Sequence, residues 1–336
     1  MEKIIKNMLN HKIKLAENLF EKPEMKATRD GYGEGLVLAG KENKDVVVLC
    51  ADLTDSTRSI VFQKEFPERF IEIGIAEQNM AGIAAGLAVS GKIPFISTYA
   101  VFCPGRNWDQ IRVNVCYNNA NVKLTGAHSG VSVGPDGATH QALEDIAITR
   151  CLPNVVVLAP CDAIETRKAT LAASKIQGPV YLRFAREKTA VITTDRTPFE
   201  IGKAEIFYEP ENPQALIIAC GPLVYKSLIA AKELEKDGIK VMVVNSHTIK
   251  PIDEKTIIEA AKICGVVVSV EDHQIMGGMG SAVAEVLAKN YPVPQEFIGM
   301  RNSFGESGQP EELLEKYGMG VKDIKEAVKK ALKRKK

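Results

Sequence analysis

Apolar residues in the first half of the chain form short continuous runs, and amphipathic stretches separate these runs. The runs lie at 45–51, 92–98, 121–127, 154–160 and 179–185. Residues with helical periodicity fill the intervals, at about 30–42, 76–90, 106–118, 139–150 and 162–175. Continuous apolar strands that alternate with helices are typical of a parallel sheet covered on both faces. The pattern therefore predicts an α/β domain over residues 25–192, preceded by a peripheral N-terminal extension at 1–24.

The stretch "TTDRTPFEIGKAEIFYEPENP" breaks this rhythm with proline and charge, and it predicts a linker at 193–213. A second cycle of apolar runs and helical patterns follows. Its runs lie at 215–221, 240–246, 265–271 and 295–300. We expect a second domain at 214–336, so the fold class is α/β, with two successive domains whose sheets are mainly parallel.

Composition describes an ordinary globular protein of 336 residues, of which 45% are hydrophobic and 25% charged. The 43 Lys and Arg residues nearly balance 42 Asp and Glu, and a net charge of +1 gives no sign of a nucleic-acid-binding surface. The basic end "KKALKRKK" is interpreted as a solvated helix terminus.

The N-terminus lacks the uninterrupted apolar core of a secretory signal, and no stretch is long enough to span a bilayer. We therefore expect a cytoplasmic protein that does not bind membranes. Seven cysteines are scattered without a CxxC pair, which indicates free thiols in a reducing compartment and no metal site in this chain.

The segment "IGIAEQNMAGIAAGLA" (73–88) places one carboxylate, Glu77, at the start of an apolar stretch. Apolar positions at three- and four-residue steps predict a helix buried on most sides, and Gly82 and Gly86 would let another backbone come close. Glu77 either complements the positive end of the helix dipole, worth a few tenths to about 1 kcal/mol, or serves as a buried functional carboxylate.

A glycine-rich loop, "AHSGVSVGPDGATHQALEDI" (127–146), holds two of the five histidines of the chain. It follows a strand and precedes a helix, so it lies at the carboxyl end of a parallel sheet, where open α/β folds bind ligands. Asp136 fits a turn and Thr139 a helix N-cap, but neither interpretation explains His128 and His140. The spacing of the two histidines is a poor zinc pattern.

The second glycine-rich stretch, "MGGMGSA" (276–282), lacks the full spacing of a phosphate-binding loop and the later acidic partner. It is interpreted as a tight turn that enters a packed helix, with phosphate binding as the alternative.

Several separated motifs resemble the transketolase family of thiamine-diphosphate enzymes. "FIEIGIAEQNMAGIAAGLAVSGKIPF" and "TYAVFCPGRNWDQIR" are similar to the pyrimidine-binding domain, as are "ATRDGYGEGL", "CADLTDSTRS", "GAHSGVSVGPDGATHQALED" and "LRFAREKTAV". "IIACGPLVYKS", "VVNSHTIKPID", "VSVEDH" and "NSFGESGQPEELLEKYGM" resemble the C-terminal domain of the family. The resemblance covers nearly the whole chain from about residue 25.

The resemblance implies that Glu77 hydrogen-bonds the pyrimidine ring nitrogen of thiamine diphosphate and takes part in the proton transfer that activates the cofactor. Tyr99 and Phe102 match aromatic residues that line the aminopyrimidine pocket, and Asp52 is assigned to cofactor binding as well. The family has a further aromatic residue where Gly105 stands here, with Arg106 next to it, so one edge of that pocket departs from the pattern.

For the substrate, the resemblance assigns four positions to a sugar phosphate: Arg29, Ser56, His128 and Arg186. Asp136 matches a residue that contacts a ketose hydroxyl, and His140 lies beside it as a substrate-binding and catalytic residue. Cationic and hydroxyl groups from separate segments suit a dianionic phosphate.

The family binds the diphosphate and its divalent metal through a GDG…N signature in a separate N-terminal domain, and no GDG occurs here. The resemblance is therefore to the C-terminal subunit of a split transketolase. A second polypeptide would carry the diphosphate and the Mg²⁺ or other divalent metal, and we expect two copies of each chain. The reaction would transfer two-carbon ketol units between sugar phosphates, in the pentose phosphate pathway.

Three alternatives stay open. 1-Deoxyxylulose-5-phosphate synthase shares "GIAEQ" but has an acidic residue where His128 stands. The beta subunit of a 2-oxoacid dehydrogenase decarboxylase is also a half-length chain, but it lacks the set formed by His128, Asp136 and His140. A non-catalytic chain that kept the fold would not be expected to keep these residues together with Glu77 and Arg186.

Overall fold

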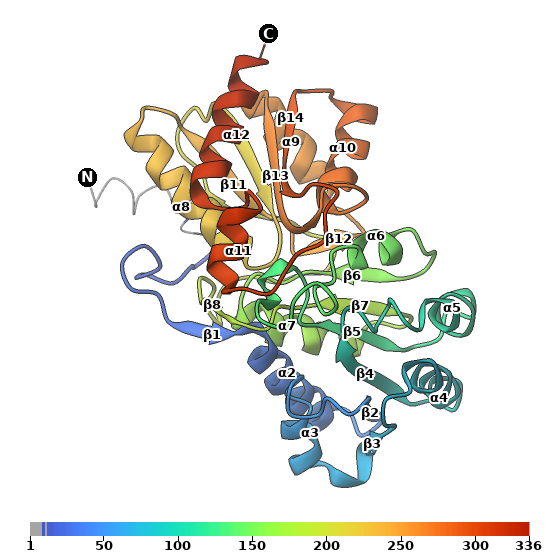
Figure 1. Cartoon of the computed structure of the whole chain (residues 1–336). Helices are drawn as coiled ribbons and strands as arrows, with labels where there is room; N and C mark the ends of the chain where they lie inside the picture. Colours follow the sequence, from blue (N-terminus) through green and yellow to red (C-terminus); the bar gives the residue numbers. More distant parts are fainter. Residues whose placement is uncertain (1–8, 11, 336) are drawn as a thin grey trace.

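The computed structural model describes residues 9–10 and 12–335, which form two α/β domains, each built on its own sheet (Figure 1). The first domain lies in the lower half of the view, from blue to green, and the second lies above it, from yellow to red. Both sheets are mainly parallel, so the predicted fold class is confirmed.

The first sheet has seven strands in the order β12-β6-β7-β5-β4-β2-β3. The strands that belong to this half of the sequence are β2 (Val46–Cys50), β3 (Phe70–Glu72), β4 (Ile93–Tyr99), β5 (Lys123–Ala127), β6 (Val156–Leu158) and β7 (Val180–Arg183). These six strands pair in parallel with one another. Since their apolar side chains are buried on both faces of the sheet, the strands read as continuous apolar runs.

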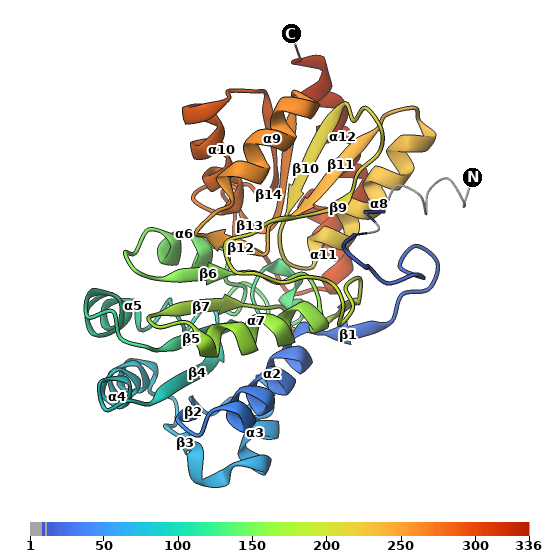
Figure 2. The same cartoon turned by 180° about the vertical axis from the view of Figure 1, so that it is seen from behind.

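Helices cover both faces of this sheet (Figure 2). One face carries α2 (Thr28–Glu42), α3 (Ile60–Glu65) and α7 (Ala163–Lys175), with a core that includes Tyr32, Leu36 and Ala169. The other face carries α4 (Glu77–Val89), α5 (Trp108–Gln110), the π-helical turn η2 (Ile111–Tyr117) and α6 (Asp145–Arg150). Two 3₁₀ turns, η1 (Pro67–Arg69) and η3 (Val131–Val133), lie in the connections.

The second sheet has the order β14-β13-β10-β11-β9. Its strands are β9 (Glu205–Tyr208), β10 (Ala215–Ala219), β11 (Val241–Asn245), β13 (Val267–Gln274) and β14 (Gln295–Met300). Helices α8 (Leu223–Lys236) and α12 (Val321–Lys333) cover one face, and α9 (Glu254–Cys264) and α10 (Met279–Asn290) cover the other (Figures 1 and 2). A short helix, α11 (Pro310–Lys316), lies where the second domain faces the first.

The two domains are joined by more than the linker. Strand β12 (Thr248–Lys250) comes from the second half of the sequence but pairs antiparallel with β6 in the first sheet. Strand β9, inside the predicted linker, pairs antiparallel with β11 in the second sheet. A two-stranded antiparallel sheet of β1 (Met25–Ala27) and β8 (Lys188–Ala190) lies beside the junction.

The predicted N-terminal extension lies partly outside the described residues, but its later part packs on the second domain. Leu19 is fully buried and Ile13 nearly so, and both belong to the core of that domain. The Asn10 amide donates to the Phe207 carbonyl at 3.1 Å.

Two local predictions are wrong in this structure, and one that concerns two glycines stays a prediction. The helix expected at 139–150 begins only at Asp145, because the loop before it continues as turns, so Thr139 is not its N-cap; its hydroxyl instead contacts His140 Nδ1 at 2.9 Å. Helix α4 is buried on one face only, since Gly86 is exposed and Val89 is 80% exposed. No backbone of this chain approaches Gly82 or Gly86 among the described residues.

All seven cysteines are free, and all but Cys151 are buried. Across residues 9–10 and 12–335, no helix combines the length and the apolar character needed to cross a membrane.

Candidate active site

Glu77 begins helix α4 and its side chain is only 2% exposed. Both carboxylate oxygens lie 3.1 Å from Nη1 of Arg106, whose side chain is about half exposed (48%). The Asn107 amide donates to the Glu77 carbonyl at 3.2 Å and so fixes the start of the helix. Glu77 is thus a buried carboxylate whose one charged partner stands between it and solvent.

The same arginine covers an aromatic ring. The Arg106 guanidinium carbon lies 4.2 Å from the centre of the Phe102 ring, which is the geometry of a cation–π contact. Phe102 in turn meets His140 edge to face at 5.6 Å between ring centres, and Tyr99 at 6.0 Å. Glu77, Phe102 and His140 are therefore parts of one continuous surface, with Arg106 lying across it.

His128 follows strand β5, with a left-handed backbone (φ +53°). Its ring stacks on Tyr99, the last residue of the neighbouring strand β4, at 4.2 Å and 23°. His128 Nε2 lies 3.2 Å from the carbonyl oxygen of Ser56, and that oxygen also accepts a hydrogen bond from Arg29 Nη1 at 3.1 Å. The carboxyl ends of β4 and β5 thus bring His128 against the turn that carries Ser56 and the helix that carries Arg29.

Burial, followed by the charges of Arg29 and Arg186, lowers the pKa of His128 from 6.5 to about 3. His128 is therefore neutral at pH 7 and acts as a hydrogen-bonding group, not as a cation. Burial, followed by the charge of Arg58, also lowers the pKa of Arg29, but an arginine stays charged in proteins. Two buried atoms here, His128 Nδ1 and Arg29 Nε, have no hydrogen-bond partner in the described part of the chain.

Arg186 closes the other side of the cluster. Its Nη1 donates to the Val133 carbonyl at 3.0 Å and lies 3.4 Å from Asp136 Oδ1. Asp136 and Arg186, which the sequence assigns to different parts of the substrate, are therefore an ion pair in this structure. A bound substrate would meet them as a coupled unit.

Asp52 is the predicted site residue that stands apart. It follows β2 with a left-handed backbone (φ +56°), its side chain is exposed, and its amide donates to Glu72 Oε1 at 2.7 Å. The remaining nine predicted residues are linked by contacts or by the electrostatic effects described above: Arg29, Ser56, Glu77, Tyr99, Phe102, His128, Asp136, His140 and Arg186.

Sequence reasoning missed the position of Arg106. It stood out only as the neighbour of Gly105, where an aromatic residue was expected. Helical spacing could have raised it, since Phe102 and Arg106 are four residues apart, but the pairing with Glu77 spans 29 positions. A contact of that kind depends on how two separate segments pack, which a local pattern does not encode.

The second glycine-rich stretch behaves as the turn it was interpreted to be. It leads into α10, and the amide groups of Met279 and Gly280 donate to the carboxylate of Glu271 at 2.7 and 2.8 Å. A carboxylate of the chain thus occupies the place that a phosphate would take at this helix N-terminus. Within the described residues, no group of three or more His, Cys, Asp or Glu side chains is arranged to hold a metal ion.

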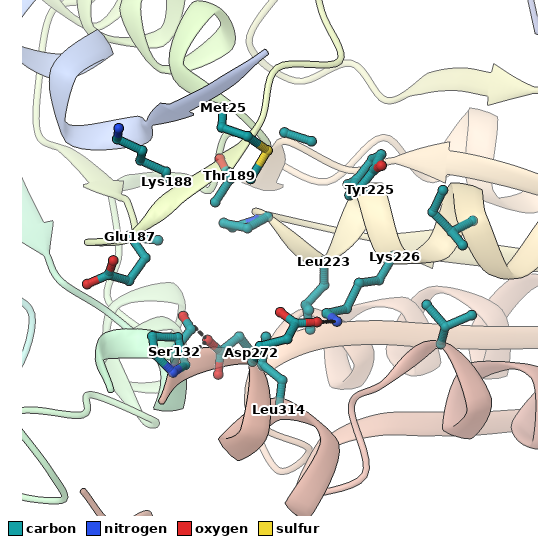
Figure 3. A pocket seen from close by; sticks show the side chains of 17 residues that line it. Met25, Ser132, Glu187, Lys188, Thr189, Leu223, Tyr225, Lys226, Asp272 and Leu314 are labelled. Atoms are coloured by element: carbon teal, nitrogen blue, oxygen red, sulfur yellow. Dashed lines mark hydrogen bonds and ion pairs between the residues drawn. The ribbon is translucent and has the colours of Figure 1, made fainter. Parts of the chain in front are cut away.

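A cavity of about 290 Å³ lies between the two domains, and Figure 3 shows it from close by. Its walls are mainly apolar, with Ser132, Glu187 and Asp272 among the polar residues. None of the ten predicted site residues lines it. The cavity is therefore separate from the cluster around Glu77 and His128.

Comparison with known proteins identifies the family of this chain. Residues 24–191 match the family described as "Transketolase, pyrimidine binding domain", and residues 202–324 match "Transketolase, C-terminal domain". The chain belongs to the transketolase family. The predicted family is confirmed, and both matched domains carry transketolase names.

Relatives of similar length share nearly the whole transketolase segment. A transketolase C-terminal section from Methanocaldococcus jannaschii is 45% identical over 312 residues, which cover 92% of this chain and 97% of that protein. The 6-deoxy-6-sulfo-D-fructose transketolase subunit SqwH of Clostridium sp. is 38% identical over 307 residues, covering 91% and 95%. A solved structure described as a split gene transketolase, an inactive beta4 tetramer, is 46% identical with a TM-score of 0.86 and covers 92% and 99%.

Membership of this family implies dependence on thiamine diphosphate, and the residues around Glu77 fit its aminopyrimidine ring. A buried carboxylate at a helix start suits a ring nitrogen that carries a proton, and the face of Phe102 suits an aromatic ring. A guanidinium, itself planar and cationic, occupies both places in this structure.

Proposed function

We propose that this chain is the C-terminal subunit of a thiamine-diphosphate-dependent transketolase, which moves two-carbon ketol units from ketose to aldose phosphates. One observation carries the proposal. A buried carboxylate, an aromatic face and two arginines with a neutral histidine form one connected cluster at the carboxyl ends of β4 and β5. The relatives that this chain resembles are transketolase sections and subunits, which favours this function over the synthase and decarboxylase alternatives.

Thiamine diphosphate supplies the carbanion chemistry of the reaction when it is bound. Glu77 holds or passes a proton at the pyrimidine nitrogen, because its carboxylate is shielded from water and lies at the edge of the ring pocket. Phe102 and Glu77 would hold the pyrimidine ring where the Arg106 guanidinium lies in this structure. Arg106 is half exposed, so its side chain has solvent to move into.

Arg29 and Arg186 supply positive charge for the terminal anionic group of the sugar, and His128 adds a neutral hydrogen bond beside them. Asp136 is placed to accept a hydrogen bond from a ketose hydroxyl while it keeps Arg186 oriented. His140, against Phe102 and Tyr99, is placed between the ring pocket and the substrate residues, where a proton must move during ketol transfer.

The partner is proposed from the relatives, which are named as a transketolase C-terminal section, a transketolase subunit and a split gene transketolase. By analogy, a separate N-terminal subunit with the GDG…N signature would hold most of the diphosphate and its Mg²⁺ or other divalent metal. Two copies of each chain would form the active enzyme. The relative named as a sulfofructose transketolase subunit makes a sulfonate a second candidate for the anionic group, because arginines bind both kinds of oxyanion.

The test is reconstitution. The chain alone should bind thiamine diphosphate weakly and show no ketol transfer, whereas addition of a polypeptide with the GDG…N motif, cofactor and Mg²⁺ should restore transfer. Ketoses with a terminal phosphate and a terminal sulfonate, measured side by side, separate the two substrate classes. Tight Mg²⁺-dependent cofactor binding by the isolated chain in calorimetry would overturn the division of labour. Absence of ketol transfer in the reconstituted complex would overturn the activity.

A further inference from the structure

A carboxylate of the second domain, that of Asp272, accepts hydrogen bonds from the loop that carries Asp136 and His140. Asp272, at the end of β13, is 5% exposed. Its Oδ1 accepts a hydrogen bond from the Val131 amide at 2.8 Å, and its Oδ2 accepts from the Ser132 amide at 3.2 Å and the Ser132 hydroxyl at 2.6 Å. Figure 3 shows Ser132 and Asp272 side by side on the wall of the interdomain cavity.

A glycine in the loop leaves room for the Asp272 carboxylate. Gly130 has a left-handed backbone (φ +85°), and a Cβ atom at this position would stand 2.1 Å from Asp272 Oδ2. Any side chain here would collide with the carboxylate and would also strain the backbone. Gly130 therefore serves the contact between the domains, which explains one glycine of the loop without reference to a ligand.

The turn that hydrogen-bonds Asp272 leads directly to the proposed substrate-binding residues. Val131 and Ser132 belong to the 3₁₀ turn η3, and the next residue, Val133, offers the carbonyl that holds Arg186 Nη1 at 3.0 Å. Arg186 in turn pairs with Asp136. A displacement of the turn thus moves the acceptor that orients the Arg186 guanidinium.

A second contact from the same domain supports the loop further on. Gln141 Nε2 donates to the Val131 carbonyl at 3.1 Å and to the carbonyl of Glu306, in the second domain, at 2.9 Å. The backbone of Asp272 is fixed as well, since its carbonyl accepts a hydrogen bond from Arg183 at 2.6 Å. Arg183 is itself paired with Asp145 at 2.8 Å, and both side chains are buried.

We infer that Asp272 is a positioning residue for the substrate anion: the second domain holds the loop through Asp272 so that Arg186 and Asp136 keep the geometry that binds the sugar phosphate. This inference rests on the proposed function for its substrate. Hydrogen bonds to an ionised carboxylate are shorter and about twice as strong as neutral ones, so one side chain can hold the turn. The C-terminal domain thereby contributes to specificity without touching the substrate.

The decisive variant is Asp272→Asn, which keeps the shape but sets an NH₂ group against the donors of Ser132. In the reconstituted enzyme the KM for phosphorylated sugars should rise about 5- to 10-fold, with kcat nearly unchanged. The KM for glycolaldehyde, which has no phosphate, should stay within about twofold. Ser132→Ala removes only one of the three hydrogen bonds and should give a smaller change of the same kind.

Asp253→Asn is the matched control in the same domain. Asp253 accepts three hydrogen bonds of the same types, from the amides of Ala204 and Thr256 and from the Thr256 hydroxyl, at 3.0, 3.1 and 2.9 Å. Its partners lie in α9 and before β9, not in the substrate loop. This variant should lower the thermal midpoint much as Asp272→Asn does, but leave both KM values unchanged.

A double-variant cycle tests the route through Arg186. If Asp272 acts through that guanidinium, Asp272→Asn should change the KM for phosphorylated sugars less than about twofold in an Arg186→Ala background. Equal effects with and without Arg186, or a KM profile of Asp272→Asn that matches Asp253→Asn, overturn the positioning role.

Hydrogen exchange of the isolated chain separates failure of this inference from failure of the proposed function. Asp272→Asn should speed exchange of the Val131 and Ser132 amides, while Asp253→Asn should not. Unchanged exchange at these amides shows that the Asp272 hydrogen bonds do not hold the loop, whether or not the reconstituted enzyme is active. If exchange is faster but the reconstituted enzyme forms no ketol-transfer product, Asp272 does hold the loop and the proposed function is wrong.

Discussion

The two domains share an α/β architecture, but the polar residues at the ends of their central strands behave differently. In the first domain, β5 leads into His128, and buried atoms such as His128 Nδ1 and Arg29 Nε have no partner within the described residues. In the second domain, β13 carries Glu271 and Asp272 near its end, and their carboxylates accept hydrogen bonds from four backbone amides. The set around His128 keeps unpaired buried atoms beside the predicted site residues, whereas both carboxylates on β13 are used in hydrogen bonds within the chain. The second domain is not uniform in this respect, since His247 Nε2, just after β11, is also buried without a partner among the described residues.

The difference teaches that a parallel sheet places chemistry at its carboxyl edge only where the chain leaves donors and acceptors free. Buried polar groups are costly when unsatisfied, about 1–3 kcal/mol each, so a protein keeps them where a ligand returns that energy. In the second domain, the Glu271 carboxylate caps the start of helix α10, and the Asp272 carboxylate holds a loop of the first domain. Fold similarity between the two halves therefore does not imply two sites.

Glu77→Gln should give the largest effect on turnover, and it tests the proposed site in the first domain. Loss of an acid–base group typically lowers turnover about 10²- to 10⁴-fold, so kcat of the reconstituted enzyme should fall by that order. Stability should change by less than about 1 kcal/mol, because the Arg106 partner is half exposed and glutamine can still accept a hydrogen bond. Steady-state kinetics and urea unfolding measure the two quantities.

Glu271→Gln is the matched substitution in the second domain, at a carboxylate that accepts hydrogen bonds from the chain itself. Glu271 is 1% exposed and accepts two amide hydrogen bonds, of which glutamine can keep one, so the free energy of unfolding should fall by about 1–3 kcal/mol. Its kcat should stay near that of the natural enzyme once folded. If instead both variants lose turnover equally, the contrast between the domains is wrong.

Arg186→Ala and His128→Ala come next and separate charge from hydrogen bonding within the open cluster. Loss of a charge-assisted contact is worth about 1.5–3 kcal/mol, so Arg186→Ala should raise the KM for phosphorylated sugars roughly 10- to 150-fold. Since His128 is neutral, its loss should cost a neutral hydrogen bond, about 2- to 10-fold. Glycolaldehyde, measured on each variant, should show neither change; equal losses on both substrates would assign the residues to the fold.

Much of the fold and part of the site could be predicted from the sequence. The continuous apolar runs located β2, β4 and β5 to within two residues, because buried parallel strands need no polar face. The short strand β3, "FIE", was missed, since three residues carry too little pattern. Glu77 and His128 were found as residues that their surroundings did not explain. Arg106 and Asp272 were not, because their partners lie 29 and 141 positions away.

The pH dependence of stability compares a buried histidine from each region. Burial, helped by the charges of Arg29 and Arg186, lowers the pKa of His128 to about 3, and burial lowers that of His247, just after β11, to about 4. An unfolded histidine titrates near 6.5, so below pH 6.5 the unfolded state binds more protons and stability falls as the pH falls. Each histidine should contribute a slope of up to about 1.4 kcal/mol per pH unit.

Urea unfolding of the isolated chain between pH 7 and 5 measures this slope, and each variant is compared with the natural chain because burial raises the pKa of Glu165 to about 7, so that its carboxyl titrates in the same range. His128→Asn and His247→Asn should each flatten it by a similar amount, and the double variant should flatten it by the sum. This result would show that burial is the main cause of both pKa shifts, so that the two domains treat a buried histidine alike. A slope unchanged by His128→Asn would mean that its imidazole is more hydrated than its burial implies.

The smallest effect concerns two helical glycines, one in each domain. Gly86 in α4 is exposed with no atom near a built Cβ, whereas a Cβ on Gly280 in α10 would stand 2.5 Å from Ser269 Oγ and 3.0 Å from the Phe297 ring. Alanine favours a helix over glycine by about 0.5–1 kcal/mol, so Gly86→Ala should stabilise the isolated chain by that amount. Gly280→Ala should destabilise it, because the packed side chains must move. Urea unfolding at low protein concentration gives both values. If Gly86→Ala destabilises the protein at high concentration and loses that effect on dilution, another chain packs on α4, and the glycines there serve an interface between subunits.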